Sequence, residues 1–239
     1  MVTIIELKNV RKVYLMGKER VVALNGINLT VEEGEICCLL GTSGSGKSTI
    51  LNLIAGLEKP TGGSIKVNNM FINRMNEKEL AKFRQKYIGF VFQAYNLLPS
   101  LTALENVTLP LIFKKVRKRK RNKMAMAMLK SVGLEKRAKH KPSQMSGGQQ
   151  QRVSLARAFI NKPAIIFADE PTGNLDTKTT LEMMELIIST VRKNKQTLIL
   201  VTHDLDIAKY ADKVVHIIDG LIDSVQVNKK EEPDNEETV

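Results

Sequence analysis

The stretch Gly41-Thr42-Ser43-Gly44-Ser45-Gly46-Lys47-Ser48 directly follows an apolar run at residues 36–40. It matches the pattern G-x-x-x-x-G-K-[ST], in which glycines let the backbone wrap tightly so that its N–H groups point at phosphate oxygens. Residues 48–54 continue as a helix, whose positive N-terminal end would strengthen the attraction. A buried strand, a glycine-rich loop and a helix in this order predict a phosphate-binding loop on an α/β fold.

Each polar residue of this loop has a chemical task in the prediction. Lys47 would neutralise the charge of the β- and γ-phosphates, and Ser48 would give its hydroxyl to Mg²⁺. The other loop residues expected to contact a nucleoside triphosphate are Gly41, Thr42, Ser43, Gly44, Ser45, Gly46 and Thr49.

Three further apolar runs resemble the one before the loop. They cover residues 88–92, 164–168 and 198–202, and they end in Gln93, in Asp169-Glu170 and in His203. Continuous apolar runs of about five residues are typical of strands buried on both faces of a parallel sheet. Because ligands bind beyond the carboxyl ends of such strands, these polar residues are expected to form one site.

The residues at these strand ends suggest hydrolysis of the triphosphate. Asp169 can hold Mg²⁺, and Glu170 can act on the water that attacks the γ-phosphate. Gln93 could orient water or complete the Mg²⁺ shell, and His203 could contact the γ-phosphate. Taken alone, each of these two is more often a structural polar residue, and their shared position supports the catalytic interpretation.

Residues 94–161 differ from the rest and predict a mostly helical insert. Thr102 and Glu105 have the spacing of a capping box, and Gly133 can end the helix that follows in the left-handed conformation. Ser146-Gly147-Gly148-Gln149 opens a later helix as a second glycine-containing anion nest. This nest has no lysine or metal ligand of its own, so it would cover a nucleotide held by a second copy of the chain. The simpler alternative is that it only caps its own helix.

These motifs, together with Gly173-Asn174-Leu175-Asp176, occur in the order seen in ATP-binding-cassette (ABC) ATPases, which the chain resembles from about residue 3 to 225. The resemblance implies an ATPase that needs Mg²⁺ and forms an ATP-dependent, head-to-tail homodimer. Each ATP would lie between the phosphate loop of one copy and the signature motif, residues 146–149, of the other. It also implies that Tyr14 stacks on adenine and that Asp176 lies in the loop coupling the two sites.

The expected fold is a P-loop NTPase core with a mostly parallel sheet, a small antiparallel β part at the N-terminus and a helical subdomain. The core would cover about residues 1–93 and 162–225, and the subdomain about 94–161, within one domain of residues 1–225. Residues 226–239 would form a disordered acidic tail. Thr42 and Met145 depart from the family, which usually has proline and leucine there.

Among ABC ATPases, the chain is most similar to the subfamily of lipoprotein-release and macrolide- or peptide-export ATPases of the MacB and LolD type. The stretches that indicate this are residues 88–93, 96–99, 101–107 and 167–176. The resemblance implies a separate membrane permease as partner, docked near residues 93–109, and a location on the cytoplasmic face of the membrane. A signalling role of the FtsE type is the alternative. A DNA- or ribosome-associated ATPase fits less well, because the chain has no room for a long coiled-coil arm.

The basic charge of the chain is concentrated in one segment. Thirteen of its 37 Lys and Arg residues, and one of its 25 Asp and Glu residues, lie between Leu111 and Lys141, so the remainder is balanced. A solvated helix face is the commonest interpretation of such a run. Contact with anionic lipid or a membrane partner is the next, and nucleic acid is not expected, because no aromatic residue interrupts residues 114–141.

Composition excludes several other classes of protein. Hydrophobic residues make up 43% of the 239, and charged residues 26%, as in ordinary globular domains. The only cysteines, Cys37 and Cys38, are adjacent within an apolar run and would point to opposite faces of a strand, which predicts reduced thiols in a cytosolic protein. No apolar run reaches the ~18 residues needed to span a bilayer.

Overall fold

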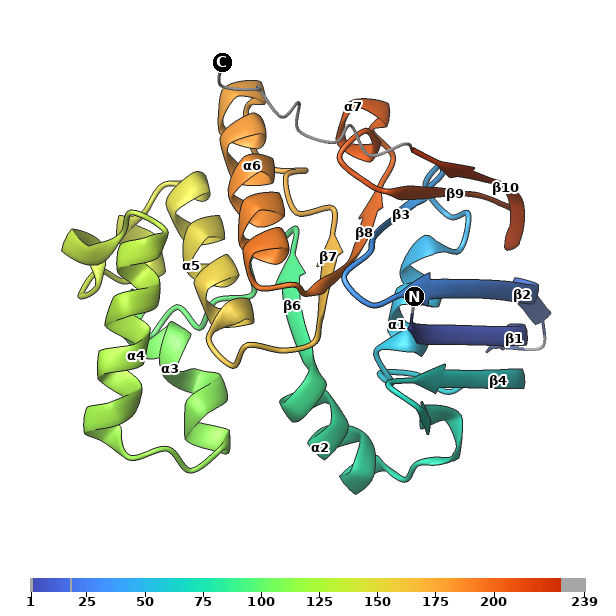
Figure 1. The fold of residues 1–239 in the computed structure, drawn as a ribbon, viewed down its shortest axis with the longest axis horizontal. Helices are drawn as coiled ribbons and strands as arrows, with labels where there is room; N and C mark the ends of the chain where they lie inside the picture. The colour runs from blue at the N-terminus through green and yellow to red at the C-terminus, as the bar shows by residue number, and fades with distance from the viewer. Residues whose placement is uncertain (1, 18, 229–239) are drawn as a thin grey trace, which may run out of the picture.

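The computed structural model describes residues 2–17 and 19–228. It contains two sheets side by side (Figure 1). The smaller is antiparallel, in the order β2-β1-β4-β5, and consists of β1 (Thr3–Met16), β2 (Glu19–Glu32), β4 (Gly62–Val67) and β5 (Met70–Phe71). This sheet is the antiparallel N-terminal part that the sequence predicts.

The larger sheet has six strands in the order β10-β9-β3-β8-β7-β6. Its strands are β3 (Ile36–Leu40), β6 (Ile88–Phe92), β7 (Ile165–Asp169), β8 (Thr197–Thr202), β9 (Lys213–Ile218) and β10 (Leu221–Val227). All neighbours pair in parallel except β10, which runs antiparallel to β9. The four apolar runs of the sequence therefore form the predicted parallel strands. β8 begins one residue earlier than expected, and β7 is shifted by one residue so that it includes Asp169.

Seven α-helices connect or follow these strands in the described part of the chain. They are α1 (Lys47–Ile54), α2 (Glu77–Tyr87), α3 (Ala103–Phe113), α4 (Lys118–Ser131), α5 (Gly147–Phe159), α6 (Thr177–Lys193) and α7 (Leu205–Ala208). None of the described helices is long and apolar enough to cross a membrane.

Both faces of the parallel sheet are buried, as its continuous apolar strands require. Cys37 belongs to the hydrophobic cluster on the face toward the antiparallel sheet and α1, whereas Cys38 belongs to the cluster shared with the helical insert. Both thiols are free and buried, and burial raises the pKa of each, to about 12 for Cys38. The thiols therefore stay protonated at neutral pH and act as small core residues.

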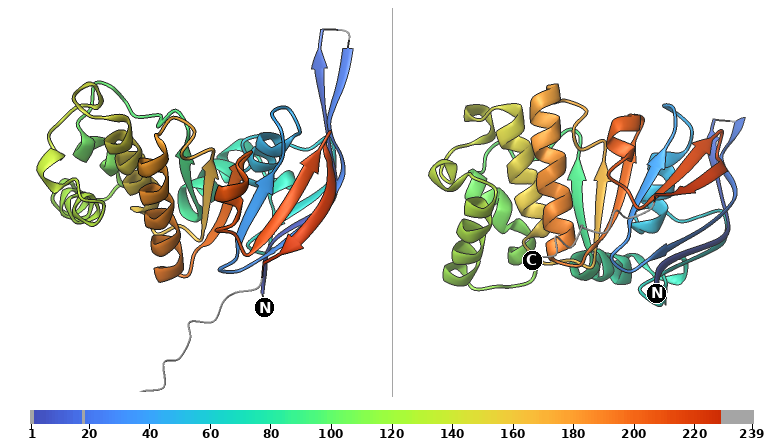
Figure 2. Two further views of the ribbon diagram at one scale, coloured as in Figure 1. Left: turned by 90° about the horizontal axis from the view of Figure 1, so that it is seen from above. Right: turned by 45° about the horizontal axis from the view of Figure 1, so that its top comes forward.

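The helical insert consists of α3, α4 and α5, which lie beyond the β6 edge of the large sheet, away from the antiparallel sheet (Figure 2). The predicted capping box starts α3: the Glu105 N–H donates to Thr102 Oγ1 at 3.2 Å, and the Thr102 N–H donates to Glu105 Oε2 at 2.8 Å. In α4, Ala125 and Leu129 are buried. Gly133, with φ of 75°, ends the segment in the left-handed conformation expected from the sequence.

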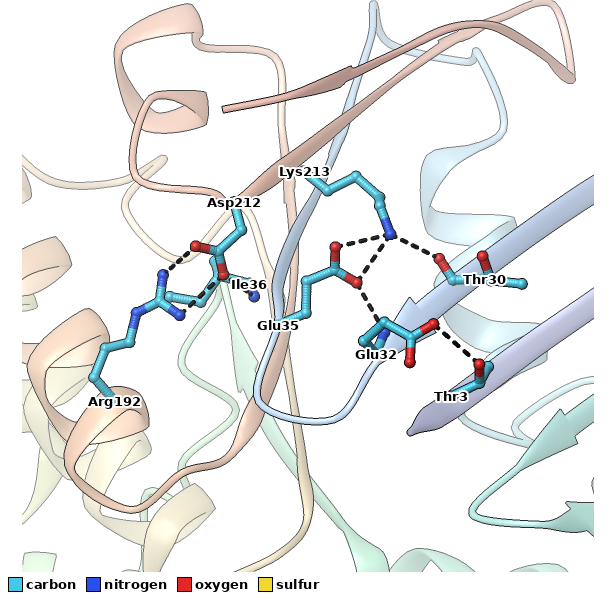
Figure 3. A network of polar contacts seen from close by, with 8 residues as sticks. All are labelled: Thr3, Thr30, Glu32, Glu35, Ile36, Arg192, Asp212 and Lys213. Carbon is cyan, nitrogen blue, oxygen red and sulfur yellow. Dashed lines mark hydrogen bonds and ion pairs between the residues drawn. The ribbon is translucent and has the colours of Figure 1, made fainter. Parts of the chain in front are cut away.

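A polar network ties the two sheets and α6 together at the amino end of β3 (Figure 3). Asp212 accepts a bond from the Ile36 N–H at 2.8 Å and two from the Arg192 guanidinium at 2.6 and 2.9 Å. Beside it, the Lys213 ammonium lies 2.7 Å from Glu35 Oε1 and donates to the Thr30 carbonyl at 3.1 Å. These contacts fix β3, and therefore the loop that follows it, relative to the antiparallel sheet.

Replacing Lys213 with methionine is expected to lower the free energy of unfolding by about 1–3 kcal/mol, because it leaves the Glu35 carboxylate buried without its cation. The side chains of this pair are only 15% and 13% exposed. Urea unfolding followed by circular dichroism measures the change. The control is Lys209→Met, which breaks an ion pair to Asp206 whose side chains are 76% and 80% exposed. This control should cost below ~1 kcal/mol. Equal losses would contradict this role for the network.

The C-terminal boundary differs from the sequence prediction. Gln226 and Val227 were assigned to the tail, but they lie in β10 and pair with β9. The reason is that an exposed edge strand needs no apolar run, so a polar sequence there resembles a tail. Asn228, the next residue of the predicted tail, is also bonded to the core, since its N–H donates to the Asp212 carbonyl at 2.8 Å. Residues 229–239 of that tail lie outside the described residues.

Candidate nucleotide-binding and catalytic site

The glycine-rich loop lies between β3 and α1, as the sequence predicts. Three of its glycines occupy positions where a side chain would be strained or would collide with neighbouring atoms. Gly44 and Gly46 have φ of 81° and 104°, which L side chains rarely adopt. A Cβ on Gly46 would lie 2.8 Å from Leu24 Cδ2 and 2.9 Å from the Ala23 carbonyl, and one on Gly41 would collide with the Ile217 carbonyl. Packing from β2 and β9 therefore holds the loop tightly curled around the start of α1.

Lys47 is folded back onto this loop. Its side chain donates from Nζ to the Thr42 carbonyl at 2.6 Å, and the residue is only 5% exposed. Burial lowers the pKa of Lys47, while the nearby carboxylates of Glu170 and Asp169 act in the opposite direction. Burial disfavours the charged form of Lys47 when it has no partner. A phosphate held by the loop would supply the opposite charge and stabilise the ammonium.

Ser48 and Asp169 lie together although they are far apart in sequence. Ser48 Oγ is 3.4 Å from Asp169 Oδ1. Burial raises the pKa of Asp169, as does the charge of Glu170, and the Ser48 hydrogen bond and Lys47 oppose the rise. A hydroxyl and a carboxylate converging on one point are hard oxygen ligands, which fits Mg²⁺ that keeps other positions for water and phosphate.

Glu170 follows directly and has an unusual backbone. Its φ is 44°, and its N–H donates to the Val201 carbonyl at 3.0 Å. The carboxylate lies 3.1 Å from Nδ1 of His203, at the end of β8. A cavity of about 580 Å³ opens here, and its lining includes Gly41, Thr42 and Ser43 of the loop together with Glu170, His203 and His216. Strained non-glycine backbone beside a cavity is typical of functional sites.

Gln93, after β6, packs against the turn that follows Glu170. A Cβ on Gly173 would lie 2.6 Å from Gln93 Nε2, so a larger residue at 173 would push this exposed carboxamide aside. Asn174 Nδ2 donates to the Gln93 carbonyl at 3.0 Å. The side chain of Gln151, fully buried on α5, donates to the carbonyls of Phe92 and Pro171 and so links the strand ends to the helical insert.

Tyr14 lies beside the start of α1 and is half-buried. Its hydroxyl donates to Glu58 Oε2 at 2.7 Å, and the Lys12 ammonium lies 4.7 Å from the ring centroid. Burial and Glu58 raise the pKa of Tyr14, whereas a hydrogen bond with Thr49 lowers it. The ring is thus anchored next to the helix that follows the phosphate loop.

The second nest begins α5. The Gln149 N–H donates to Ser146 Oγ at 3.3 Å, and the Ser146 N–H donates to Gln149 Oε1 at 3.2 Å, which completes a capping box. The side chains of Ser146 and Gln149 thus cap their own helix. The N–H groups of Gly147 and Gly148 are the first of the helix and have no carbonyl partner within it. Asp176 likewise caps α6, with its carboxylate accepting from the Thr179 N–H at 3.0 Å.

The fold brings together Lys47, Ser48, Asp169, Glu170 and His203 at the carboxyl ends of β3, β7 and β8, and Gln93 directly follows the neighbouring strand β6. It does not bring the second nest to them: α5 and α1 lie on opposite sides of β6, β7 and β8 (Figure 1). Sequence reasoning overlooked Gln151 and His216. Gln151 shares a helical face with the buried Leu155, which was the only signal available for it.

Known proteins resemble the chain closely. The ABC transporter family model matches residues 24–173. The ABC transporter ATP-binding protein MJ0796 of Methanocaldococcus jannaschii is 49% identical over 223 residues, 92% of this chain and 95% of the relative. The lipoprotein-releasing system ATP-binding protein LolD of Geobacter metallireducens is 45% identical over 222 residues, 93% and 99% of the two chains.

A solved structure agrees with the fold. The dimeric post-hydrolysis state of the ATP-binding cassette MJ0796, bound to ADP and Pi, has a TM-score of 0.88 and 46% sequence identity and covers 95% of this chain and 99% of that one. The family match over more than half of the residues, and relatives nearly half identical over almost the full length, show that the chain belongs to the ABC transporter family and is an ABC-type ATPase.

Proposed function

We propose that two copies of this chain bind two ATP molecules head to tail and power a separate membrane permease of the MacB or LolD type, which moves a peptide, lipoprotein or drug. The observation that supports this best is the separation of the two nests within one chain. The phosphate loop begins α1 and the residues 146–149 begin α5, with strands of the large sheet between them. A nucleotide bound by the loop of one copy therefore needs the second nest of another.

Within each composite site, the loop glycines and Lys47 bind and orient the phosphates, and Tyr14 stacks on adenine. Glu170 accepts the proton of the attacking water. His203, 3.1 Å from its carboxylate, holds that carboxylate in place beside the γ-phosphate. Ser146, Gly147, Gly148 and Gln149 of the partner copy close the site, and Asp176 couples the two sites. Positioning and electrostatics of this kind account for most of the catalysis in phosphoryl transfer.

Ser48 and Asp169 are the residues that would hold Mg²⁺, with Gln93, directly after the adjacent strand β6, completing its surroundings. When bound, Mg²⁺ supplies positive charge that stabilises the phosphate oxygens. The main chain of Gln93 is bonded to the turn that follows Glu170, through Asn174 Nδ2 at 3.0 Å, and its carboxamide lies beside Gly173 of the same turn.

A permease contact is supported by an apolar cavity of about 630 Å³ between α2 and α3. Leu109, Pro110 and Phe113 form its apolar part, and Lys82 and Arg84 also line it. It adjoins the region near residues 93–109 that the sequence suggests for docking. We place the ATPase on the cytoplasmic face of the membrane, held there by the permease.

A mixing experiment tests the head-to-tail arrangement. Lys47→Ala disables the phosphate loop and Gly148→Asp puts a negative charge into the second nest. Each variant alone should be inactive, whereas their mixture should regain ATP hydrolysis, because a mixed dimer has one composite site free of both changes. A mixture that forms dimers by light scattering but stays inactive would show that each copy completes its own site.

A further inference from the structure

The most strongly charged surface of the described chain lies at the junction of α3 and α4. We call it the basic surface and define it as residues 112–123. It contains eight Lys and Arg residues and no Asp or Glu: Lys114, Lys115, Arg117, Lys118, Arg119, Lys120, Arg121 and Lys123. None of the roles assigned above involves these eight side chains.

These cations face solvent. All of them are exposed except Arg121, which is half-buried. Within residues 2–17 and 19–228, no salt bridge pairs any of the eight with a carboxylate. Hydrogen bonds with Thr102 lower the pKa of Glu105, and the charges of Lys141 and Lys118 add to this effect. The surface is thus an uncompensated field of positive charge.

The start of α4 concentrates this charge at an unfavourable place. Arg117 is the N-cap residue and makes no side-chain capping bond, and the first turn contains no acidic residue. Cations at the positive end of a helix destabilise it. α3, α5 and α6 all begin at a Thr, Ser or Asp whose side chain accepts a backbone N–H. α1 shares the uncapped start of α4, but it begins at the glycine-rich loop and not at a run of cations. A capping residue followed by acidic residues in the first turn would make α4 more stable in the free protein.

Apolar side chains border the same surface. Phe113, which also lines the cavity between α2 and α3, is 71% exposed, and Ile112 is 41% exposed, at the end of α3 immediately before the first lysine. The α3–α4 junction lies at the edge of the molecule opposite the carboxyl ends of β6, β7 and β8 (Figure 1). A partner bound here would leave the nucleotide site open.

We propose that the basic surface binds the anionic headgroups of a lipid membrane, with Phe113 entering the headgroup region. Clustered Lys and Arg beside an exposed aromatic residue is the pattern of membrane-surface attachment. The charges are spread over a loop and a helix start, which suits a layer of many headgroups. Nucleic acid fits less well, because no aromatic residue lies between Lys114 and Lys141 to stack on bases.

Vesicle co-sedimentation of the purified full chain, without nucleotide, tests this proposal independently of ATP hydrolysis and of the dimer. The chain should sediment with phosphatidylcholine vesicles that contain phosphatidylglycerol and not with vesicles of phosphatidylcholine alone. Binding should fall as salt is raised, because the attraction is electrostatic. Equal binding to both kinds of vesicle, or none to either, would overturn the proposal.

Two variants locate the binding surface. Neutralising the first turn of α4 should weaken binding on the order of 100-fold or more, since each cation near an anionic surface contributes to the attraction. Because those cations oppose the helix dipole, the variant should melt no lower than the original chain, which excludes misfolding as the cause. Phe113→Ser should weaken binding by about tenfold. The neutralising variant replaces Arg117, Lys118, Arg119 and Lys120 with Gln.

A control of equal charge change lies on the antiparallel sheet: Lys8, Arg11, Arg20 and Lys66 replaced with Gln. It should retain most of the vesicle binding, because only the location of the charge differs. A similar loss in the control would assign the binding to net charge and overturn the proposal. Stronger binding to double-stranded DNA than to anionic vesicles at the same salt concentration would overturn it as well.

Discussion

Replacing Glu170 with Gln is expected to lower the rate of ATP hydrolysis by at least about 100-fold while leaving ATP bound, because a carboxamide cannot accept the proton of the attacking water. The change keeps the shape of the side chain. The left-handed φ of residue 170 and its backbone bond to Val201 can therefore persist. Phosphate release under saturating ATP and Mg²⁺ measures the rate, and equilibrium binding of ATP measures the affinity.

The control for Glu170→Gln is Glu182→Gln, which removes a half-exposed carboxylate that pairs with Arg152 at 3.1 Å on the surface of α6. It should hydrolyse ATP at the original rate. Hydrolysis by Glu170→Gln at that same rate would contradict the assignment of the base. A loss of ATP binding would instead show that Glu170 shapes the binding site.

Lys47→Ala should weaken ATP binding by about 10- to 100-fold or more, because it removes a charge-assisted contact to the phosphates, and such contacts contribute about 1.5–3 kcal/mol each. The ammonium is buried and already bonded to the Thr42 carbonyl, so it needs no rearrangement of the main chain to meet a phosphate. Titration with a fluorescent ATP analogue measures the affinity.

Lys209→Ala is the matched control for Lys47→Ala, since it removes an exposed lysine far from the loop in sequence. Its affinity for ATP should be unchanged. If Lys47→Ala bound ATP as tightly as the original chain, Lys47 would have a purely structural role in the loop. Lys47→Arg is not a conservative replacement here, because a planar guanidinium does not fit where a compact ammonium is buried.

Much of this fold follows from short sequence patterns. The four apolar runs predict the parallel strands because a strand buried on both faces has a continuous apolar sequence, without the alternation of apolar and polar residues seen in half-exposed strands. The loop between β3 and α1 is predicted because its glycines have few other uses at that spacing. The Thr102 capping box and the Gly133 helix end are formed by residues close in sequence, so they can be predicted without knowing the contacts with the rest of the chain.

Features that depend on distant contacts could not be predicted. The bonds of buried Gln151 to Phe92 and Pro171 connect three segments, and the sequence offers only three consecutive glutamines. The positive φ of Glu170 depends on the parallel register that brings Val201 opposite Asp169. The last two residues of β10 were missed because a polar edge strand has no apolar signal of its own. The roles of the site residues in ATP turnover remain predictions.

The central claim is that ATP joins two copies of this chain, each supplying the part of the site that the other lacks. Light scattering of Glu170→Gln with saturating ATP and Mg²⁺ measures this most directly, because blocked hydrolysis should hold the joined state. We predict twice the monomer mass with ATP, the monomer mass without it, and the monomer mass for Glu170→Gln combined with Lys47→Ala. A monomer of Glu170→Gln with ATP bound at saturation would contradict the account.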